Sequence, residues 1–298
     1  MEDFTGELGK MGLLSDYLKR TESVLLARKE SPELPITSMP DLNKKIWGLP
    51  KGKMTVIGAR TSMGKTSFVL QMAIDVLTQG KSIHYFSFEM TKEQIVERMF
   101  CNLYKVDNYA LLSGKFTEYL SLWDDFKEHL SNLRIVMSNE FGQSWKDIER
   151  FLSVLTVKPD VIIVDYIQAV AKAAVEGKGF IDEYIRKFRE ICITHNIAGV
   201  IVSQLNRSTV EDGKSVPNLH NLKGSGFLEE LADLVVLLEW TGKKQQKTDF
   251  IVNVAKNRNG RTGFIKVKYE PEFYKFSDFP KEEMTEEEKY QKFSKVGK

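Results

Sequence analysis

Ala59-Arg60-Thr61-Ser62-Met63-Gly64-Lys65-Thr66-Ser67 is the stretch that decides the fold of this chain. An apolar run, Met54 to Ile57, precedes it, and a helix-like segment, Ser67 to Leu77, follows it. The backbone N–H groups of such a loop and the first turn of the helix form a concave anion site, so this order predicts a phosphate-binding loop. Lys65 would reach the β- and γ-phosphates of a nucleotide, and Thr66 would ligate Mg²⁺.

Residues Ala59 to Ser67 are therefore candidates for nucleotide binding. The strict pattern has glycine at its first position, where this chain has Ala59 preceded by Gly58. A small residue there still permits close approach of the phosphates. The alternative is a surface turn before an ordinary helix.

The composition limits the classes of protein to consider. With 298 residues, 42% of them hydrophobic, the chain suffices for one large domain or two small ones. The net charge of +2 gives no general case for nucleic acid or membrane, so any basic site is local. Cys101 and Cys192 form no C-x-x-C pair, which favours a reduced, cytoplasmic protein. No apolar run approaches the ~20 residues of a membrane span, and the first residues lack a signal-peptide core.

The chain divides into three regions. Residues 1–35 carry apolar positions at roughly helical spacing and predict one amphipathic helix, which packs on its own domain or on a neighbouring subunit. Prolines punctuate residues 33–45, which we interpret as an irregular linker at the domain entrance. Residues 36–277 form the main domain, and the tail, residues 278–298, is dense in Lys and Glu, as flexible segments are.

Strand-like and helix-like segments alternate through the middle of the chain. Val161-Ile162-Ile163-Val164 is a continuous β-branched run, which is typical of a parallel strand buried on both faces. The alternation predicts an α/β fold, a mostly parallel twisted sheet flanked by helices, with antiparallel strands at its C-terminal end. The expected strands are residues 54–57, 82–88, 133–137, 161–165, 198–202, 234–238, 249–255 and 263–269.

Three polar residues follow predicted strands and match what nucleotide hydrolysis needs. Asp165 is a candidate metal ligand, and the alternative is an aspartate that merely caps a strand. Glu89 would polarise the attacking water, or else it is a charge favoured at a helix N-terminus. Gln204 would bond the γ-phosphate or the water, although polar residues after strands are common.

Two basic segments are further candidates. Lys256-Asn257-Arg258-Asn259-Gly260-Arg261 places Lys256 and Arg258 at alternate positions, hence on one side if the strand continues. A guanidinium beside a γ-phosphate neutralises developing charge, often from a neighbouring subunit, and the alternative is a basic hairpin in water. The loop 214–226 ends in Lys223-Gly224-Ser225-Gly226 and has no interleaved aromatics, so contact with sugar and phosphate is expected.

Five motifs stand in one order along the chain: Gly58 to Thr66, Phe86-Ser87-Phe88-Glu89-Met90, Val164-Asp165-Tyr166-Ile167-Gln168, Ser203-Gln204-Leu205-Asn206-Arg207 and Lys256-Asn257-Arg258-Asn259-Gly260. In this order they resemble the motor domain of DnaB-type replicative DNA helicases, from about Ile36 to Tyr274. The resemblance implies a RecA-like P-loop NTPase core. It also implies a homo-oligomeric ring, usually a hexamer, around single-stranded DNA, with ATP at subunit interfaces.

The resemblance gives each candidate in the phosphate region a role. Lys65 and Thr66 would bind phosphate and magnesium, and Asp165 would hold the metal. Glu89 would activate water, and Gln204 would sense the γ-phosphate. The implied cofactors are ATP and Mg²⁺, and the implied activity is ATP-driven DNA unwinding.

The same resemblance assigns Lys256 and Arg258 a role in trans and the run from Lys223 to Gly226 contact with DNA. Family members often carry Arg and Glu where this chain has Lys223 and Gly224. They usually also have an N-terminal helical domain that engages primase, whereas only residues 1–35 precede the motor here. A primase or helicase loader is an expected partner on this basis. The alternatives are a RecA-like or KaiC-like ATPase without unwinding activity, and a regulatory subunit that only binds nucleotide.

Overall fold

The computed structural model describes residues 14–26, 34–138, 144–173, 178–205, 219–222, 226–240 and 249–279. The chain forms two compact units, residues 1–33 and 34–298. In the first unit, α2 (Leu14–Leu26) is a helix where the apolar spacing predicted one. Its large apolar side chains are exposed, namely Leu14, Tyr17, Leu18, Leu25 and Leu26.

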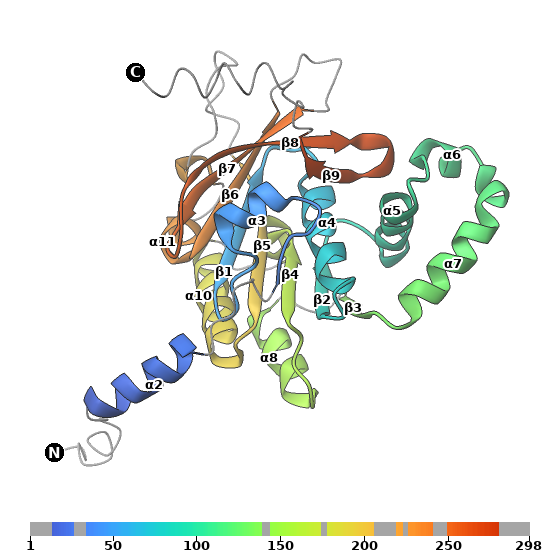
Figure 1. Ribbon diagram of the computed structural model, residues 1–298. Coiled ribbons are helices and arrows are strands. Elements are labelled where there is room, and N and C mark those ends of the chain that lie inside the picture. Colours follow the sequence, from blue (N-terminus) through green and yellow to red (C-terminus); the bar gives the residue numbers. More distant parts are fainter. Residues whose placement is uncertain are drawn as a thin grey trace, which may run out of the picture. The chain divides into compact units, whose positions relative to one another are not determined.

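A nine-stranded sheet organises the second unit, in the order β3-β2-β4-β5-β1-β6-β7-β8-β9 (Figure 1). Strands β1 to β6 run parallel and the rest antiparallel. This confirms the predicted α/β sheet with antiparallel strands at its C-terminal end. The strands are β1 (Met54–Ala59), β2 (Ser82–Ser87), β3 (Arg134–Ser138), β4 (Val161–Asp165), β5 (Ala198–Gln204), β6 (Leu234–Trp240), β7 (Asp249–Asn257), β8 (Gly263–Glu270) and β9 (Lys275–Asp278).

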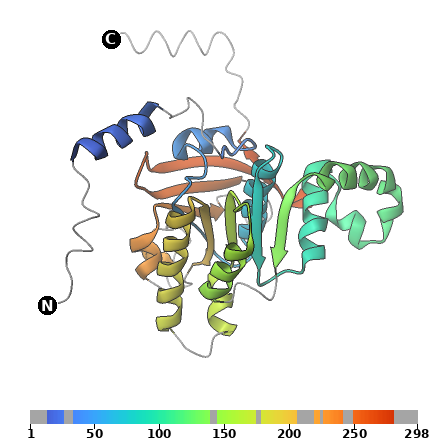
Figure 2. The ribbon, with the colours of Figure 1, turned by 90° about the horizontal axis from the view of Figure 1, so that it is seen from below.

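Helices cover both faces of the sheet because the central parallel strands are buried on both sides. One hydrophobic cluster joins the sheet to α3 (Pro40–Ile46), α4 (Lys65–Leu77), α5 (Lys92–Tyr104), α6 (Asn108–Leu112) and α7 (Leu120–Ser131). The other joins it to α8 (Trp145–Val154), α9 (Ile167–Ala173), α10 (Lys178–His195) and α11 (Gly226–Leu231). Figure 2 shows the helices of residues 145–195 together on one side and the lobe of residues 92–131 at the β2–β3 end. The 3₁₀ turns are η1 (Lys115–Tyr119), η2 (Leu219–Asn221) and η3 (Pro271–Phe273).

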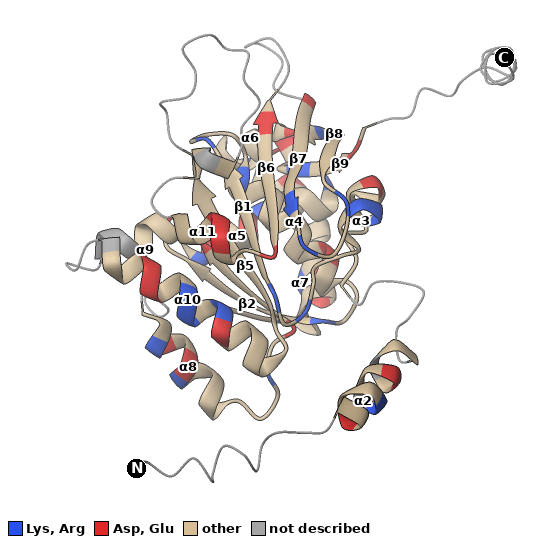
Figure 3. Ribbon diagram, turned by 90° about the vertical axis from the view of Figure 1, so that its left-hand side faces the viewer, with Lys and Arg blue, Asp and Glu red and all other residues tan. Residues whose placement is uncertain are grey.

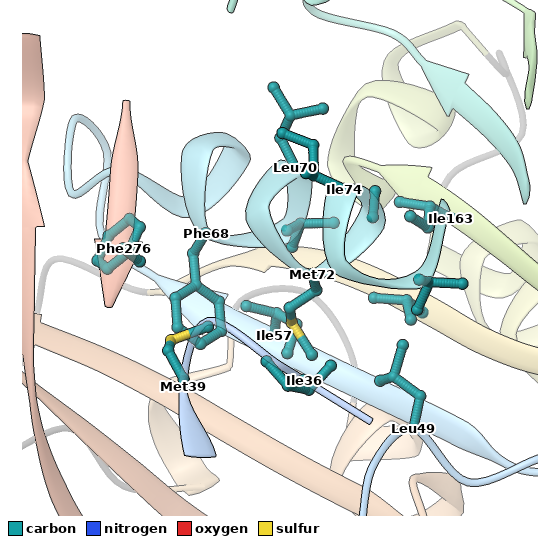
Figure 4. Packing of buried hydrophobic residues seen from close by; sticks show 14 of the residues in the cluster. Ile36, Met39, Leu49, Ile57, Phe68, Leu70, Met72, Ile74, Ile163 and Phe276 are labelled. Carbon is teal, nitrogen blue, oxygen red and sulfur yellow. The ribbon is translucent and has the colours of Figure 1, made fainter. Parts of the chain in front are cut away.

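The first cluster fixes α4 and hence the loop before it. Phe68 of α4 is fully buried against Phe276 of β9, with ring centroids 5.2 Å apart and the rings edge to face. Met39 and Ile57 complete the packing around it (Figure 4). Each fully buried side chain of this size contributes roughly 1.5–3 kcal/mol relative to an exposed one. The start of α4 is therefore anchored from three directions.

Charged residues occur along the helices, as the colours of Figure 3 show for α8 and α10, while the inner strands are mainly apolar. In the part of the chain that the structure describes, no helix is long and apolar enough to cross a membrane.

Three elements differ from the sequence-based expectations. Residues 33–45 were predicted to be irregular, but Pro40 starts α3, where its missing N–H costs nothing. Helix α9 begins within the motif after Asp165, and β9 was not predicted. Strand β9 is short, with Phe276 its single buried side chain, so it gives no period-two signal. The tail, residues 280–298, lies outside the described residues.

Candidate functional site

The loop between β1 and α4 takes a conformation suited to anions. Gly64 precedes α4 at φ 68°, and Ser62 also has a positive φ of 62°. A side chain at Gly64 would be strained and would place its Cβ 3.4 Å from the Phe276 ring. Because α4 begins here, its first N–H groups have no partner within the helix and face the loop. These groups and the helix dipole would form the predicted phosphate cradle.

A pocket of about 300 Å³ opens over this cradle. It is lined by Thr61, Ser62, Gly64, Lys65, Thr66, Ser67, Glu89, Met90, Arg98, Tyr269 and Tyr274. Three members of the predicted nucleotide-binding run point elsewhere. Ala59 is fully buried at the end of β1, Met63 packs against the core, and Arg60 Nη2 lies 3.7 Å from Glu239 Oε2 on β6.

Lys65 and Glu89 form an ion pair in the pocket. Lys65 is 6% exposed, and its Nζ lies 3.4 Å from Glu89 Oε2 and 5.0 Å from the centre of the Tyr166 ring. Glu89 follows β2 by two residues, and its side chain is 47% exposed. The backbone N–H of Phe88 donates to the carbonyl of Asp165 at 2.8 Å, which holds the ends of β2 and β4 together.

Asp165 ends β4 beside this pair and is 2% exposed. Its Oδ2 accepts a hydrogen bond of 2.9 Å from the Tyr85 hydroxyl. Its buried Oδ1 has no hydrogen-bond partner in the described structure. Burial raises the pKa of the Asp165 carboxyl, and Tyr85, Thr66 and Lys65 act in the opposite direction. A cation at Oδ1 would supply the missing partner and favour the charged carboxylate.

Gln204 lies on the same edge of the sheet. It ends β5, which lies between β4 and β1, and it is paired with Ala59. The three neighbouring strands therefore bring Asp165, Gln204 and the cradle together at their carboxyl ends. Ligands bind at these ends in open α/β sheets. Within the described residues no group of three or more His, Cys, Asp or Glu is arranged to hold a metal ion. A cation here would need further oxygen ligands from the bound nucleotide.

Lys256 and Arg258 lie at the opposite end of the parallel strands, near their amino ends. Lys256 Nζ donates to the carbonyls of Glu229 and Glu230 at 2.6 and 3.0 Å. Arg258 Nη2 donates to the Glu230 carbonyl at 2.8 Å, and its Nη1 lies 3.4 Å from Asp233 Oδ1. The two side chains thus project to the same side, as their alternate spacing predicted, and they cap the C-terminus of α11. Burial, and then Arg258, lower the pKa of Lys256.

The place of this cation pair follows from the register. The N–H of Asp233 donates to the carbonyl of Met54, the first residue of β1, at 2.9 Å. The cradle begins after Ala59, at the other end of β1. At ~3.3 Å per residue the two ends of this strand are roughly 17 Å apart. Lys256 and Arg258 therefore lie away from the pocket of their own chain.

Comparison with known proteins settles the family of a chain with this geometry. Residues 36–278 match the family described as DnaB-like helicase C terminal domain. The chain belongs to this family. A probable plasmid replicative DNA helicase of Chlamydia trachomatis is 29% identical to this DnaB-like domain over 250 residues, which cover 82% of this chain and 55% of that protein. Replicative DNA helicase DnaB of Helicobacter pylori is 25% identical in an alignment of 327 positions that covers 92% of this chain and 66% of that protein. The DnaB-like chain thus spans little more than half the length of the chlamydial relative.

Solved structures agree on the fold. The ATPase domain of G40P superposes on the DnaB-like chain with a TM-score of 0.79 at 21% identity, covering 91% of this chain and all of that one. A DnaB-like replicative helicase, described with its interactions with primase, gives the same TM-score and identity and covers 93% and 70%. These likenesses show that the chain shares the fold of those two structures.

Four residues that line one wall of the pocket in the DnaB-like domain were not candidate site residues from the sequence, namely Met90, Arg98, Tyr269 and Tyr274. Arg98 comes from α5, and its guanidinium carbon lies 4.6 Å from the centre of the Tyr274 ring. Tyr269 of β8 donates from its hydroxyl to Ser67 Oγ at 3.3 Å. Met90 completes this side. These residues are distant in sequence, and no local spacing connects them. The capping box of Thr91 and Gln94 fixes the start of α5 and was the one available signal, for the helix rather than for Arg98.

The predicted DNA-contacting residues are only partly described. Lys223, Gly224 and Ser225 lie outside the described residues, and Gly226 is the first residue of α11 with open space beside it. Leu222 forms an isolated antiparallel bridge with Leu205, which directly follows Gln204. In the DnaB-like domain, residues 219–222 therefore end beside the end of β5.

Proposed function

We propose that this DnaB-like domain is the ATP-driven motor of a replicative DNA helicase, which hydrolyses ATP between copies of the chain and translocates on single-stranded DNA. One observation carries the proposal. Lys65, Glu89 and Asp165 lie together at the carboxyl ends of the parallel strands, while Lys256 and Arg258 are held near the amino ends. A site assembled from both ends needs two chains.

The cradle and its wall suit a nucleoside triphosphate. The N–H groups at the start of α4 and Lys65 bind the phosphates, as a helix N-terminus with a buried cation favours anions. The Tyr274 ring and the Arg98 guanidinium offer flat surfaces to a base. The Thr66 hydroxyl and Asp165 Oδ1 would hold Mg²⁺, which supplies positive charge to the transferred phosphoryl group.

Proton transfer and charge neutralisation fall to separate groups. Glu89 is exposed enough to meet water and accepts its proton when Lys65 turns from the carboxylate to the phosphates. Gln204 binds the γ-phosphate or the attacking water from the end of β5. Lys256 and Arg258 of a neighbouring copy neutralise the charge that develops on the phosphoryl oxygens.

The helices offer surfaces for self-assembly. The exposed apolar residues of α2 recur at helical spacing. A cleft of about 520 Å³ in the lobe of residues 92–131 is lined mainly by apolar side chains, namely Val96, Phe100, Leu111, Leu112, Phe116 and Trp123. We propose that α2 of one copy packs into this cleft of the next and closes a ring, with six members as the expected number. Because the DnaB-like helicase of known structure interacts with primase, a primase or loader is the expected class of further partner.

The first test is the ATPase rate as a function of protein concentration, with and without single-stranded DNA, alongside molar mass from light scattering. The proposal expects the rate per chain to rise with concentration as the molar mass increases, and DNA to stimulate it. Lys65→Ala, which removes the buried cation of the cradle, serves as the inactive control. A monomer with a constant specific rate that ignores DNA would contradict the shared site and the motor function.

Contact with DNA is tested separately. Lys223→Ala is expected to weaken binding to single-stranded DNA and to leave the basal ATPase rate unchanged, because a phosphate contact lies apart from the hydrolysis groups. Fluorescence anisotropy with a labelled oligonucleotide measures the affinity. Unchanged affinity would exclude this loop residue as a DNA contact.

A further inference from the structure

The side chain of Gln168 is bonded to the end of the strand that carries Gln204. Gln168 belongs to α9, three residues after Asp165, and is 8% exposed. Its Oε1 accepts a hydrogen bond of 3.0 Å from the backbone N–H of Gln204. Its Nε2 donates to Ser203 Oγ at 2.9 Å. The carboxamide therefore joins α9 to the last two residues of β5.

The register of the sheet explains why a side chain is needed there. Strand β5 pairs with β1 as far as Ala59 and Gln204, whereas its pairing with β4 stops at Val164 and Ile201. The end of β5 thus has a strand partner on one side only. A carboxamide has the donor and acceptor of a peptide group, so Gln168 replaces the absent strand on the β4 side. Without it, the N–H of Gln204 would be left unpaired, which costs about 1–3 kcal/mol where water is excluded.

Gln168 is itself fixed relative to β4, the strand that ends in Asp165. Its neighbours Ile167 and Val170 are 1% and 0% exposed. The N–H of Ala169 donates to the carbonyl of Tyr166 at 3.0 Å, in the turn that follows Asp165. Few backbone bonds therefore separate Gln168 from Asp165, and none of them lies in an exposed segment. The Gln168 side chain therefore fixes the backbone of Gln204 relative to Asp165.

We propose that Gln168 is a positioning residue that holds Gln204 in register with Asp165 and the phosphate loop. Gln204 is the register partner of Ala59 on β1, and the N–H of the next residue, Leu205, donates to the Ala59 carbonyl at 3.0 Å. Gln168 holds the Gln204 N–H on the other side, so the Gln204 side chain starts from a backbone fixed to both halves of the site. This inference rests on the proposed role of Gln204 at the γ-phosphate. Gln168 would act through Gln204 and not as a catalytic group itself.

The test compares steady-state ATPase parameters of variants in the full chain, with single-stranded DNA present. Gln168→Met removes both hydrogen bonds at similar volume, and Gln168→Asn keeps the amide but is too short to reach. Both are expected to lower kcat about tenfold with KM and nucleotide Kd unchanged, since small misplacements cost up to roughly 100-fold. Gln168→Glu keeps the acceptor for the Gln204 N–H, and the Ser203 hydroxyl can turn to donate to it, so kcat is expected to stay within about threefold of the original.

Two references make the result decisive. Gln204→Ala is expected to be at least as slow as Gln168→Met, and the double variant no slower than Gln204→Ala alone, because one residue acts through the other. Ser203→Ala, which leaves the bond to Gln204 intact, is the matched control with an expected kcat near the original. Normal kcat in Gln168→Asn beside a slow Gln204→Ala, or a double variant with multiplied losses, would overturn the inference. Normal kcat in Gln204→Ala would instead overturn the proposed role of Gln204.

Discussion

At the scale of single residues, the proposed mechanism gives the ion pair of Lys65 and Glu89 two states. The 3.4 Å ion pair compensates the charge of a lysine that is 6% exposed. On the proposed mechanism, the lysine turns to phosphate and the carboxylate is released toward water. The observed ion pair would then be the resting arrangement of two groups that act separately during hydrolysis.

Glu89→Gln tests this assignment. The amide keeps the size of the side chain but cannot take a proton, so kcat is expected to fall by about 100-fold or more while nucleotide affinity is retained. Steady-state ATPase rates and binding of a fluorescent ATP analogue measure the two effects. Glu128→Gln, an exposed change on α7, is the matched control. A Glu89→Gln protein that hydrolyses at the normal rate would exclude Glu89 as the base.

His84 gives a prediction about stability rather than activity. It is 1% exposed on β2, its Nε2 lies 2.8 Å from Ser138 Oγ, and burial lowers its pKa to about 4. The unfolded chain therefore binds a proton between about pH 6.5 and 4 that the folded chain does not. The stability that His84 contributes is complete above this range and is lost as the pH falls through it.

Denaturant unfolding at pH 7 and pH 5 measures this dependence. His84 is expected to account for a loss of about 2 kcal/mol between these two values. His84→Gln should remove that part of the pH dependence, whereas His129→Gln, at an exposed position on α7, should leave it in place. An unchanged slope in His84→Gln would show that other groups cause it.

At the scale of elements, the start of α4 depends on the conformation of Gly64. Gly64→Ala is expected to cost about 1–2 kcal/mol of stability because L-residues disfavour this region, and to weaken nucleotide binding because the cradle must shift. Gly80, with φ 73° and open space where a Cβ would lie, is the control position. Gly80→Ala should cost similar stability and leave nucleotide affinity unchanged. Calorimetry and equilibrium binding distinguish the two, and equal affinities would contradict the role of the turn.

The elements also show what the sequence could and could not predict. Strands such as Val161–Asp165 were predicted because burial on both faces leaves a continuous apolar run. Helix α3 was missed because Pro40 was interpreted as a breaker, although it stands at the first helical position. Strand β9 was missed because its place depends on tertiary packing of Phe276 against Phe68, which no local pattern encodes.

At the scale of the whole molecule, the cradle and the cation pair lie at opposite ends of the parallel strands. This separation predicts that two defective chains can complement each other. Arg258→Ala lacks the proposed finger but has an intact cradle, and Lys65→Ala has the reverse. Each alone is expected to be inactive, and Arg258→Ala should still bind nucleotide. Mixed in equal amounts, they should recover part of the ATPase activity, since some interfaces pair an intact cradle with an intact finger.

Arg261→Ala is the matched control for this experiment, because Arg261 is an exposed cation in the same turn. Its activity is expected to be normal both alone and in mixtures. Mixtures of Arg258→Ala and Lys65→Ala without recovered activity, under conditions where light scattering shows that they co-assemble, would argue against the shared site.

The placement of the candidate site was only partly predictable because some of its residues come from distant segments that meet only in the folded domain. The loop before α4, Glu89 and Asp165 were candidates from the sequence because each follows a recognisable strand, and the fold brings them together at the carboxyl ends of the parallel strands. Arg98 and Tyr274 were not found, since α5 and the end of η3 meet only in the folded domain. The separation of Arg258 from its own pocket likewise needed the observed pairing of β6 with β7.

The separation of cradle and cation pair also has a consequence for counting. In an open row of copies, the cradle at one end faces no finger, and the finger at the other end faces no cradle. On the proposed shared site, such a row has one complete site fewer than it has members, and joining its ends supplies the last one. Specific activity would therefore rise with the length of an open row and become independent of size once the row is closed.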